Sequence, residues 1–331
     1  MLKFWGICGT YNTIVQLLRH LARVIRHSDL TQFSTRAAAI SYHVLRGRLK
    51  ISHLGISGRR KAKLANPHIR AVVICHIYYT ELCEELLDTA ARAPFVDRII
   101  ITCPPEKYTV VNNKVFALVD TVSISCPPEK SRPIQANLRA IGGNTNLCEI
   151  KVVATENIGR DVASFLKCID DPWVTEADLL LKIHGKRSPY LVAGKGNFWR
   201  QHLLESLSPT SSNRRQGLAR ILSKMGTSTN THALWPIRWA YSVESWGENR
   251  AATKNLWPDH RTKKSGPLLF PAGTMFWCNR AFVKNLSALP PLDFKPSHHS
   301  NENSLDGTPA HAAERAFGQL ALANGSVTLS W

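Results

Sequence analysis

The sequence predicts a mostly parallel α/β protein, because apolar runs of strand length alternate with segments of helical periodicity. The pattern reads strand 71–77, helix 81–93, strand 98–102, strand 149–154, helix 161–169 and strand 179–183. Strands that are joined through helices pair in parallel and are covered on both faces. We therefore expect one mostly parallel sheet between layers of helices.

The other elements follow a weaker pattern. Between 103 and 148 the apolar periodicity fades, and Cys-Pro-Pro-Glu-Lys occurs twice, at 103–107 and 126–130, as a turn and not as a repeat architecture. Further on, the expected elements are helices at 197–207 and 214–225, a strand at 268–277, and helices at 280–289 and 309–323.

Charge and composition divide the chain at residue 66. The 331 residues are 44% hydrophobic, which is enough for one large core or two smaller ones. Residues 1–70 hold thirteen Lys and Arg against one acid, so they carry +12 of the net charge of +18. We expect residues 1–66 to form a basic arm with a partly structured linker at 28–66, and 67–331 to form the α/β domain. The charge therefore requires no nucleic-acid partner.

Within the arm, Ile14, Leu17, Leu18, Leu21, Val24 and Ile25 recur at helical spacing. The segment lacks an apolar run of about 18 residues and an Ala-x-Ala cleavage site, so it is neither a spanning helix nor a signal peptide. Residues 1–30 either lie on an anionic membrane surface or pack on their own domain or a partner. We expect a cytoplasmic protein, and the first alternative predicts that it is peripheral on the inner face of the cell membrane.

The eight cysteines are scattered without a Cys-x-x-Cys pair, which is typical of small core hydrophobes in a reducing compartment. His298 and His299, near Glu302 and Asp306, fit no specific metal-ligand spacing. We therefore expect no metal ion or other cofactor, with a divalent metal as the disfavoured alternative.

Two polar loops follow successive strands. In the first, Gly159 permits a tight turn between Asn157 and Arg160, and Asp161 suits the N-cap of the next helix, whose free N–H groups favour a phosphate or a sugar hydroxyl. Alternatively, Asp161 only caps the helix, and Asn157 and Arg160 only hold the turn.

The second loop contains His184, Lys186, Arg187 and Ser188, a set of side chains that suits a diphosphate. A basic surface loop is the alternative. Because both loops follow parallel strands, they should meet at one edge of the sheet, where open α/β folds bind ligands.

Three further segments are candidates. Gly273 lies among small residues in 270–277, where the backbone either approaches a ligand or packs tightly on a neighbouring strand.

His311 belongs to the helix that begins near 306–315, and Glu314 and Arg315 there also suit a structural ion pair. Tyr78 and Tyr79 follow His76 at a strand end and either stack on a base or sugar or lie at the core edge.

Five motifs in this order resemble the rhamnan synthesis F family of bacterial polysaccharide-assembly proteins: 76–79, 157–161, 183–188, 270–277 and 306–315. The resemblance covers roughly residues 70 to 325. It implies a glycosyltransferase that moves rhamnose from a deoxythymidine-diphosphate donor to a growing cell-surface polysaccharide such as the lipopolysaccharide O-antigen. The acceptor would be a saccharide or a lipid-linked saccharide.

More distantly, the sequence is similar to the Rossmann-like GT-A layout of nucleotide-sugar enzymes, in which Asp-x-Asp ends a strand. His184-Gly185-Lys186 stands in that place here, which argues against metal dependence. The resemblance implies a donor site made of His76, Tyr78, Tyr79, Asn157, Gly159, Arg160, Asp161, His184, Lys186, Arg187, Ser188, Gly273 and His311.

In the mechanism that this implies, Lys186 and Arg187 neutralise the leaving diphosphate and His184 hydrogen-bonds to it. Asp306, or Glu302 as second choice, takes the proton of the acceptor hydroxyl in a single inverting displacement. One alternative is a non-catalytic polysaccharide-assembly or sugar-binding protein of the same fold. A nucleic-acid-binding protein is disfavoured, because the basic arm contains no recognised RNA or DNA module.

Overall fold

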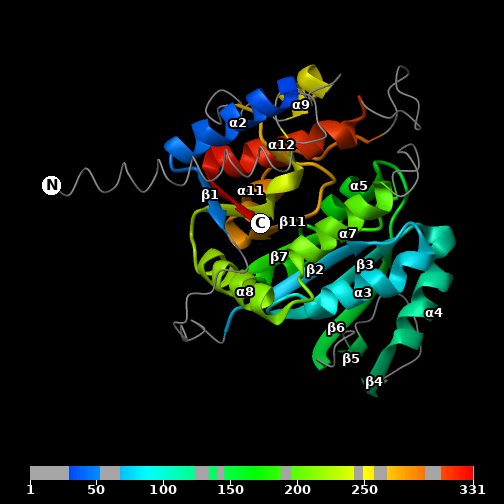
Figure 1. The fold of residues 1–331 in the computed structure, drawn as a ribbon. Coiled ribbons are helices and arrows are strands. Elements are labelled where there is room, and N and C mark those ends of the chain that lie inside the picture. The colour runs from blue at the N-terminus through cyan, green and yellow to red at the C-terminus, as the bar shows by residue number, and fades with distance from the viewer. Residues whose placement is uncertain are drawn as a thin grey trace.

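A computed structural model describes residues 30–52, 68–123, 134–139, 145–187, 195–241, 249–256, 267–294 and 307–330. Its centre is a ten-stranded sheet in the order β1-β12-β8-β11-β7-β2-β3-β6-β5-β4 (Figure 1). The strands are β1 Leu49–Ser52, β2 Ala71–His76, β3 Val96–Cys103, β4 Val119–Ser123, β5 Ile134–Arg139, β6 Thr145–Ala154, β7 Leu179–His184, β8 Thr231–Pro236, β11 Phe276–Asn279 and β12 Gly325–Ser330.

The sheet is mostly parallel, which confirms the predicted α/β class. β7, β2, β3 and β6 pair in parallel, and so do β1, β12 and β8. β11 is antiparallel to both β7 and β8, and β5 is antiparallel to β6 and β4. β11 therefore joins two parallel blocks that run in the same direction.

The register brings the carboxyl ends of the four central strands to one edge. His76 at the end of β2 is paired with His184 of β7 and with Thr102 of β3, and Cys103 is paired with Ala154 of β6. We call this edge, formed by β7, β2, β3 and β6, the carboxyl edge. It is where a parallel sheet presents its following loops to a ligand.

Helices cover both faces of the sheet (Figure 1). One face carries α3 Cys83–Arg92, α4 Tyr108–Leu118, α7 Lys195–Leu207 and α8 Ser212–Gly226. The other carries α2 Leu30–Leu45, α5 Arg160–Lys167, α6 Pro172–Glu176, α11 Arg280–Ser287 and α12 Pro309–Asn324, with α9 Asn249–Leu256 against α12. Every residue of β2 and β7 is buried, which explains their continuous apolar sequences.

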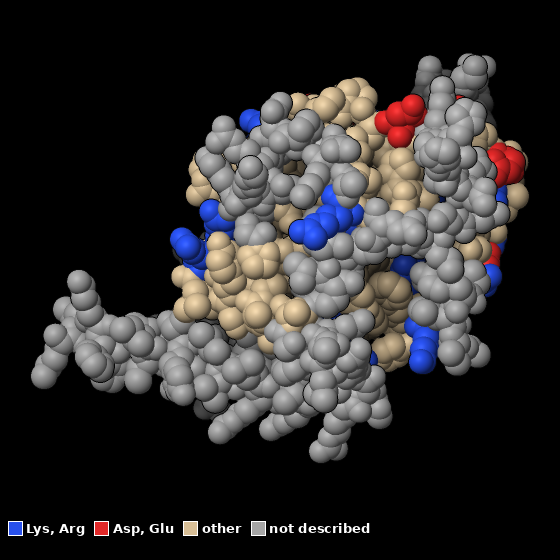
Figure 2. All heavy atoms as spheres, turned by 90° about the horizontal axis from the view of Figure 1, so that it is seen from above, with Lys and Arg blue, Asp and Glu red and all other residues tan. Residues whose placement is uncertain are grey.

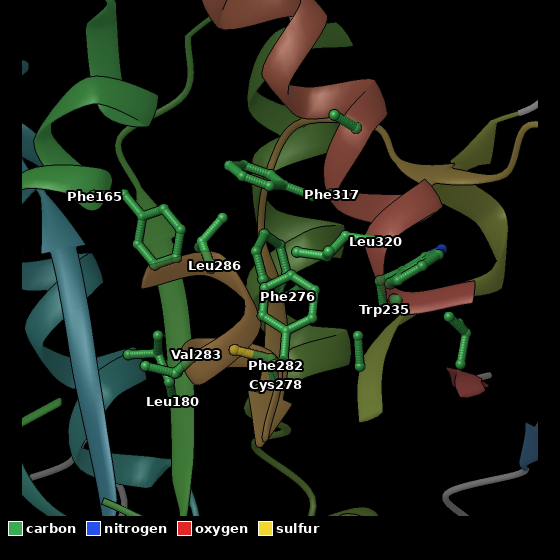
Figure 3. Packing of buried hydrophobic residues seen from close by; sticks show 14 of the residues in the cluster. Phe165, Leu180, Trp235, Phe276, Cys278, Phe282, Val283, Leu286, Phe317 and Leu320 are labelled. Carbon is green, nitrogen blue, oxygen red and sulfur yellow. The ribbon is translucent and has the colours of Figure 1, made fainter. Parts of the chain in front are cut away.

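Four phenylalanines hold together the helices on the second face (Figure 3). The ring centroid of Phe165 on α5 lies 6.0 Å from that of Phe276 on β11 and 5.8 Å from that of Phe317 on α12. Phe282 of α11 lies 5.8 Å from Phe276. The near-perpendicular contacts suit the ring quadrupoles, so this cluster fixes α5 and α12 above the sheet.

The prediction of a single strand at 268–277 is wrong. The segment forms β10 Phe270–Pro271, which pairs with β9 Ala240–Tyr241 in a separate two-stranded sheet, and then the first half of β11. Between them Gly273 and Thr274 have φ of 92° and 50°, and this left-handed backbone cannot continue a strand. We call residues 271–275 the Gly273 turn.

Part of the expected linker is structured, because α2 and β1 lie within 30–52 and β1 pairs with β12 in the main sheet. Residues 1–29, which include the amphipathic arm, and residues 53–67 lie outside the described residues. None of the helices in the described part of the chain combines the length and apolar character needed to cross a membrane. The five cysteines described with side chains are buried and unpaired, as predicted for core residues.

In the described part of the chain, three short 3-10 helices connect these elements, at Thr80–Leu82, Pro105–Lys107 and Ile237–Trp239. The first two follow β2 and β3 directly, so they contribute to the carboxyl edge.

Candidate active site

The alternation of β7 determines which of its side chains reach α5. Leu179, Leu181 and Ile183 pack in the core under α3 and α7, so Lys182 and His184 point to the opposite face. Both are buried, with Lys182 only 1% exposed. A lysine and a histidine thus lie inside the molecule next to the first turn of α5.

Asp161 of α5 binds these two residues. Its Oδ2 accepts a hydrogen bond from Lys182 Nζ at 2.5 Å and one from Thr274 Oγ1 at 2.7 Å. His184 Nε2 lies 3.7 Å from the same oxygen. The first turn of α5, which follows the loop after β6, therefore reaches the end of β7, although two strands separate β6 from β7 in the sheet.

The ionisation of this group follows from burial and charge. Burial raises the pKa of Asp161, but the neighbouring His184 and Lys182 and the hydrogen bonds from Lys182 and Thr274 outweigh it, so its pKa lies well below the usual value. Burial lowers the pKa of Lys182, and Asp161 opposes that shift. Burial also lowers the pKa of His184 to about 3, so its ring is neutral at pH 7.

The Gly273 turn is held on three sides. Its Gly273 carbonyl accepts a hydrogen bond from His184 Nε2 at 2.7 Å, and its Thr274 carbonyl accepts one from Lys182 Nζ at 2.9 Å. The Gly273 N–H donates to Glu314 Oε1 of α12 at 2.7 Å.

Burial raises the pKa of Glu314, while Arg315 and Lys186 lower it. His184 Nε2, expected to reach a diphosphate, thus binds backbone here.

Asp161 is not the N-cap of α5, contrary to the prediction. The N-cap is Gly159 with φ of 78°, and Arg160 with φ of 55° begins the helix. The Asp161 carboxylate lies in the first turn instead, because Lys182 and Thr274 draw it toward the sheet. A Cβ at Gly159 would come within 2.5 Å of the Phe294 ring, so this turn requires glycine for space as well as for φ.

Arg160 reaches the start of α12. Its Nη1 lies 3.3 Å from His311 Nε2, and His311 Nδ1 lies 2.8 Å from the hydroxyl of the N-cap residue Thr308. Asn157, three residues before Arg160 on the same loop, is exposed. The motifs at 157–161 and 306–315 therefore converge.

His76 continues the buried polar row across the sheet. Its Nδ1 is 3.0 Å from Thr102 Oγ1, and burial lowers its pKa to about 4. It is 5% exposed, so in this structure it supports the carboxyl edge from inside.

The more exposed cations lie on the α3 and α7 side of the edge. Lys186 Nζ is 4.1 Å from the centre of the Trp199 ring, and Arg187 Cζ is 4.9 Å from the centre of the Tyr79 ring. Arg187 also forms an ion pair with Glu81 at 2.8 Å.

The loops after β2 and β3 are joined on this side by Lys107. Its Nζ donates to the Tyr78 carbonyl at 2.7 Å and lies 3.5 Å from the centre of the Tyr78 ring. Lys107, Lys186 and Arg187 thus place three cations among the aromatic side chains of this edge.

The Gly273 turn connects the two sides. A Cβ on Gly273 would come within 3.5 Å of the Trp199 ring and 3.0 Å of Leu203, while the carbonyl of the same residue is bound by His184. The buried group around Asp161 and the layer of Lys186 and Trp199 are therefore adjacent.

Some predicted residues lie outside the described part of the chain: Ser188, the candidate bases Asp306 and Glu302, and the pair His298 and His299. Within the described residues, no group of three or more His, Cys, Asp or Glu side chains could hold a metal ion.

The sequence prediction missed several residues at this site: Lys107, Lys182, Trp199 and Thr274. Glu314 was considered for an ion pair, but its hydrogen bond from the Gly273 N–H was not foreseen. Lys182 carried a signal, because a lysine inside the apolar run Leu-Leu-Leu-Lys-Ile-His is costly unless it finds a buried partner. Lys107 also follows a predicted strand. Trp199, Thr274 and Glu314 come from distant elements, and only the fold reveals their proximity.

Surface charge in the described part of the chain is unevenly placed. On the face in Figure 2 the visible Lys and Arg side chains form separate groups, and the visible Asp and Glu side chains lie toward one side of the molecule.

Comparison with known proteins identifies the family. The sequence model of rhamnan synthesis protein F matches residues 129–326, which is more than half of the chain. The chain belongs to the rhamnan synthesis protein F family. This match includes four of the five motifs, and only the segment 76–79 lies before it. Family membership implies involvement in rhamnan or related polysaccharide synthesis.

The curated relatives are much longer proteins. "Uncharacterized protein WxcX" from two strains of Xanthomonas campestris pathovar campestris is 28% identical over 265 residues, which cover 77% of this chain and 32% of the relative. The chain thus spans about a third of the length of these relatives. No solved structure matches the chain significantly.

Proposed function

We propose that this protein is a glycosyltransferase of the GT-A type, which transfers rhamnose from deoxythymidine-diphosphate rhamnose to a saccharide or lipid-linked acceptor. The observation that carries the proposal is the contact of the first turn of α5, which follows the loop after β6, with the end of β7, through Asp161, Lys182 and His184. Open parallel sheets bind nucleotides at this edge. The family supports the polysaccharide context of the reaction.

In this proposal Lys186 and Arg187 receive the negative charge that develops on the diphosphate as the bond to the sugar breaks. Both lie at the carboxyl edge outside the buried group, and Arg187 is exposed. Fixed cations stabilise such a transition state without a bound metal ion. Tyr78, Tyr79, Asn157, Arg160, Ser188 and His311 surround the donor.

The buried residues act one step away from the donor. Asp161 is bound by Lys182 and Thr274, and His184 by the Gly273 carbonyl, so both orient the loops that hold the donor. His76 and Gly159 have the same role. Asp306, with Glu302 as the alternative, removes the proton of the acceptor hydroxyl, and the reaction inverts the anomeric centre in one displacement.

The test measures transfer from deoxythymidine-diphosphate rhamnose together with binding of deoxythymidine diphosphate by calorimetry, with and without EDTA. Lys186→Ala should lower transfer about a hundredfold while the thermal midpoint is kept, as for removal of one preorganised stabilising group. Lys167→Ala removes an exposed cation in the last turn of α5 and is the matched control. Unchanged transfer by Lys186→Ala would exclude the assignment.

The candidate base is tested separately. Asp306→Asn should abolish transfer and leave the binding of deoxythymidine diphosphate intact. A protein that binds the nucleotide but shows no turnover with any acceptor would instead support the alternative, a non-catalytic sugar-binding member of the same assembly machinery.

A further inference from the structure

Two neighbouring residues in the N-terminal half of α7 contact the loop that carries Lys186. Arg200 binds the Lys186 main chain, and Trp199 contacts the Lys186 ammonium. We propose that Arg200 and Trp199 are positioning residues, which hold Lys186 ready for an anionic diphosphate before it binds. This inference rests on the role proposed above for Lys186 and assigns that role a structural cause.

Arg200 is a buried connector between three elements. It is 4% exposed, and its Nε donates to Glu85 Oε2 of α3 at 2.9 Å. Its Nη1 donates to the Lys186 carbonyl at 3.0 Å and to Asn197 Oδ1 at 3.0 Å. The rigid fork of a guanidinium thus fixes the backbone of Lys186 relative to α3 and α7.

Backbone hydrogen bonds also hold the described start of this loop, and the Lys186 N–H donates to the His184 carbonyl at 3.0 Å. Residues 185–187 belong to no helix or strand, and the Gly185 N–H donates to the His76 carbonyl at 3.1 Å. The contact from Arg200 comes one residue later, so the backbone is held on both sides of the peptide that precedes Lys186. This arrangement fixes where the lysine side chain begins.

Trp199 determines where the side chain ends. The Lys186 Nζ lies 4.1 Å from the centre of the Trp199 ring, within the range of a cation–π contact. Trp199 itself is stacked on Trp239, with centroids 4.8 Å apart and planes inclined by 24°. The Trp239 indole N–H donates to His202 Nδ1 at 3.0 Å, which fixes the second ring.

Holding both ends of the lysine matters because its four-carbon stem is flexible. A free lysine loses rotamer entropy when it binds a phosphate, whereas a lysine already fixed loses less. Fixed charge is also what stabilises a leaving group most effectively. Trp199 and Arg200 therefore control how well the Lys186 ammonium stabilises a bound diphosphate.

The experiment is a double-mutant cycle on the full chain, with inorganic pyrophosphate and deoxythymidine diphosphate as ligands in calorimetry and transfer as a second readout. Arg200→Ala and Trp199→Leu should each weaken binding and kcat/KM by about tenfold or more, as expected for a displaced binding group. In the Lys186→Ala background the same changes should have almost no further effect, because residues that act through one group are not additive.

Two variants guard against a purely structural effect. Trp199→Phe retains an aromatic face and should recover much of the loss seen in Trp199→Leu. Arg214→Ala removes another arginine that pairs with a glutamate, Glu205 at 3.3 Å, and should leave binding unchanged. If Arg200→Ala proves too unstable to measure, the Trp199 series alone decides.

The outcomes separate the two proposals. If the effects of Lys186→Ala and of the α7 variants multiply in the double mutants, the positioning role is overturned while the role of Lys186 stands. If Lys186→Ala itself changes neither binding nor transfer, the proposed function of Lys186 is overturned, and the positioning inference with it.

Discussion

Asp161 and Lys182 form a buried ion pair, with Oδ2 and Nζ 2.5 Å apart, that joins the first turn of α5 to the end of β7. The Lys182 side chain is 1% exposed and that of Asp161 is 13% exposed. Thr274 Oγ1 also binds Asp161, and the Thr274 carbonyl also binds Lys182. The start of α5 and the end of β7 are thus joined by an ion pair whose ammonium group is shielded from water.

Asp161→Ala should therefore lower the free energy of unfolding by about 3–5 kcal/mol, because it leaves the Lys182 ammonium buried without its counter-charge. The double variant Asp161→Ala, Lys182→Met should recover much of this loss. Urea denaturation gives both values. As a control, Glu81→Ala breaks the exposed pair with Arg187 and should cost less than about 1 kcal/mol. Equal losses in the two single variants would contradict the buried role.

His76 should make stability dependent on pH. Burial lowers its folded pKa to about 4, below the usual 6.5, so between these values the unfolded chain binds a proton that the folded chain does not. Stability therefore falls as pH decreases from 6.5 to about 4, by up to about 1.4 kcal/mol per pH unit. His76→Gln should remove this part of the slope in urea denaturation at pH 5, 6 and 7.5. An unchanged slope would show that His76 does not titrate in this way.

Gly159 should be less replaceable than Gly47, although both have left-handed backbone, with φ of 78° and 68°. Both substitutions to alanine carry the conformational cost of about 1–2 kcal/mol. Only at Gly159 does the new Cβ meet the Phe294 ring, at 2.5 Å, whereas nothing lies within 4 Å at Gly47. We expect Gly159→Ala to lose about 1–3 kcal/mol more than Gly47→Ala in thermal or urea unfolding. Similar losses would mean that the Phe294 contact relaxes without cost.

Phe317 should be a large contributor to stability, because its ring contacts Phe165 and Phe276 in the core between α5, α12 and β11. Phe317→Ala should cost about 3–5 kcal/mol. Phe198→Ala, at a position that is 50% exposed, should change stability by only about 0.5 kcal/mol. The comparison uses urea denaturation of the two variants. If Phe317→Ala lowered the free energy of unfolding only slightly, the phenylalanine cluster would not be what holds α5 and α12 on the sheet.

The sequence predicted the central elements well, for a physical reason. β2 and β7 are buried on both faces, so their sequences are continuously apolar, and α5 shows a clear apolar stripe that includes Val162 and Phe165. β8 and β12 were not predicted, although most of their residues are buried, because Thr, His, Gly and Ser interrupt their apolar runs. β1 was missed because it has four residues in a basic segment.

The site was predicted in part. The parallel topology predicted that the loops after β6 and β7 approach each other, and Asp161 in the first turn of α5 does contact Lys182 of β7. Lys186 and Arg187, in the loop after β7, lie on the α3 and α7 side instead. The inward position of His184 was not foreseen, because sequence position alone does not tell whether the last residue of a strand faces a helix or solvent. The contribution of Arg200 depends on α3 and α7 being neighbours, which no local pattern encodes.

The Gly273 turn touches both the interior group, through His184 and Lys182, and the outer layer, through the close approach to Trp199. A substitution in the Gly273 turn is consequently expected to lower both the stability of the fold and the affinity for the ligand. Loss of activity in a variant of the turn is thus weak grounds for naming a catalytic group. Lys186 and Trp199 lie outside the buried group of Asp161, Lys182 and His184. Substitutions at these two positions therefore test ligand binding without disturbing the buried ion pair.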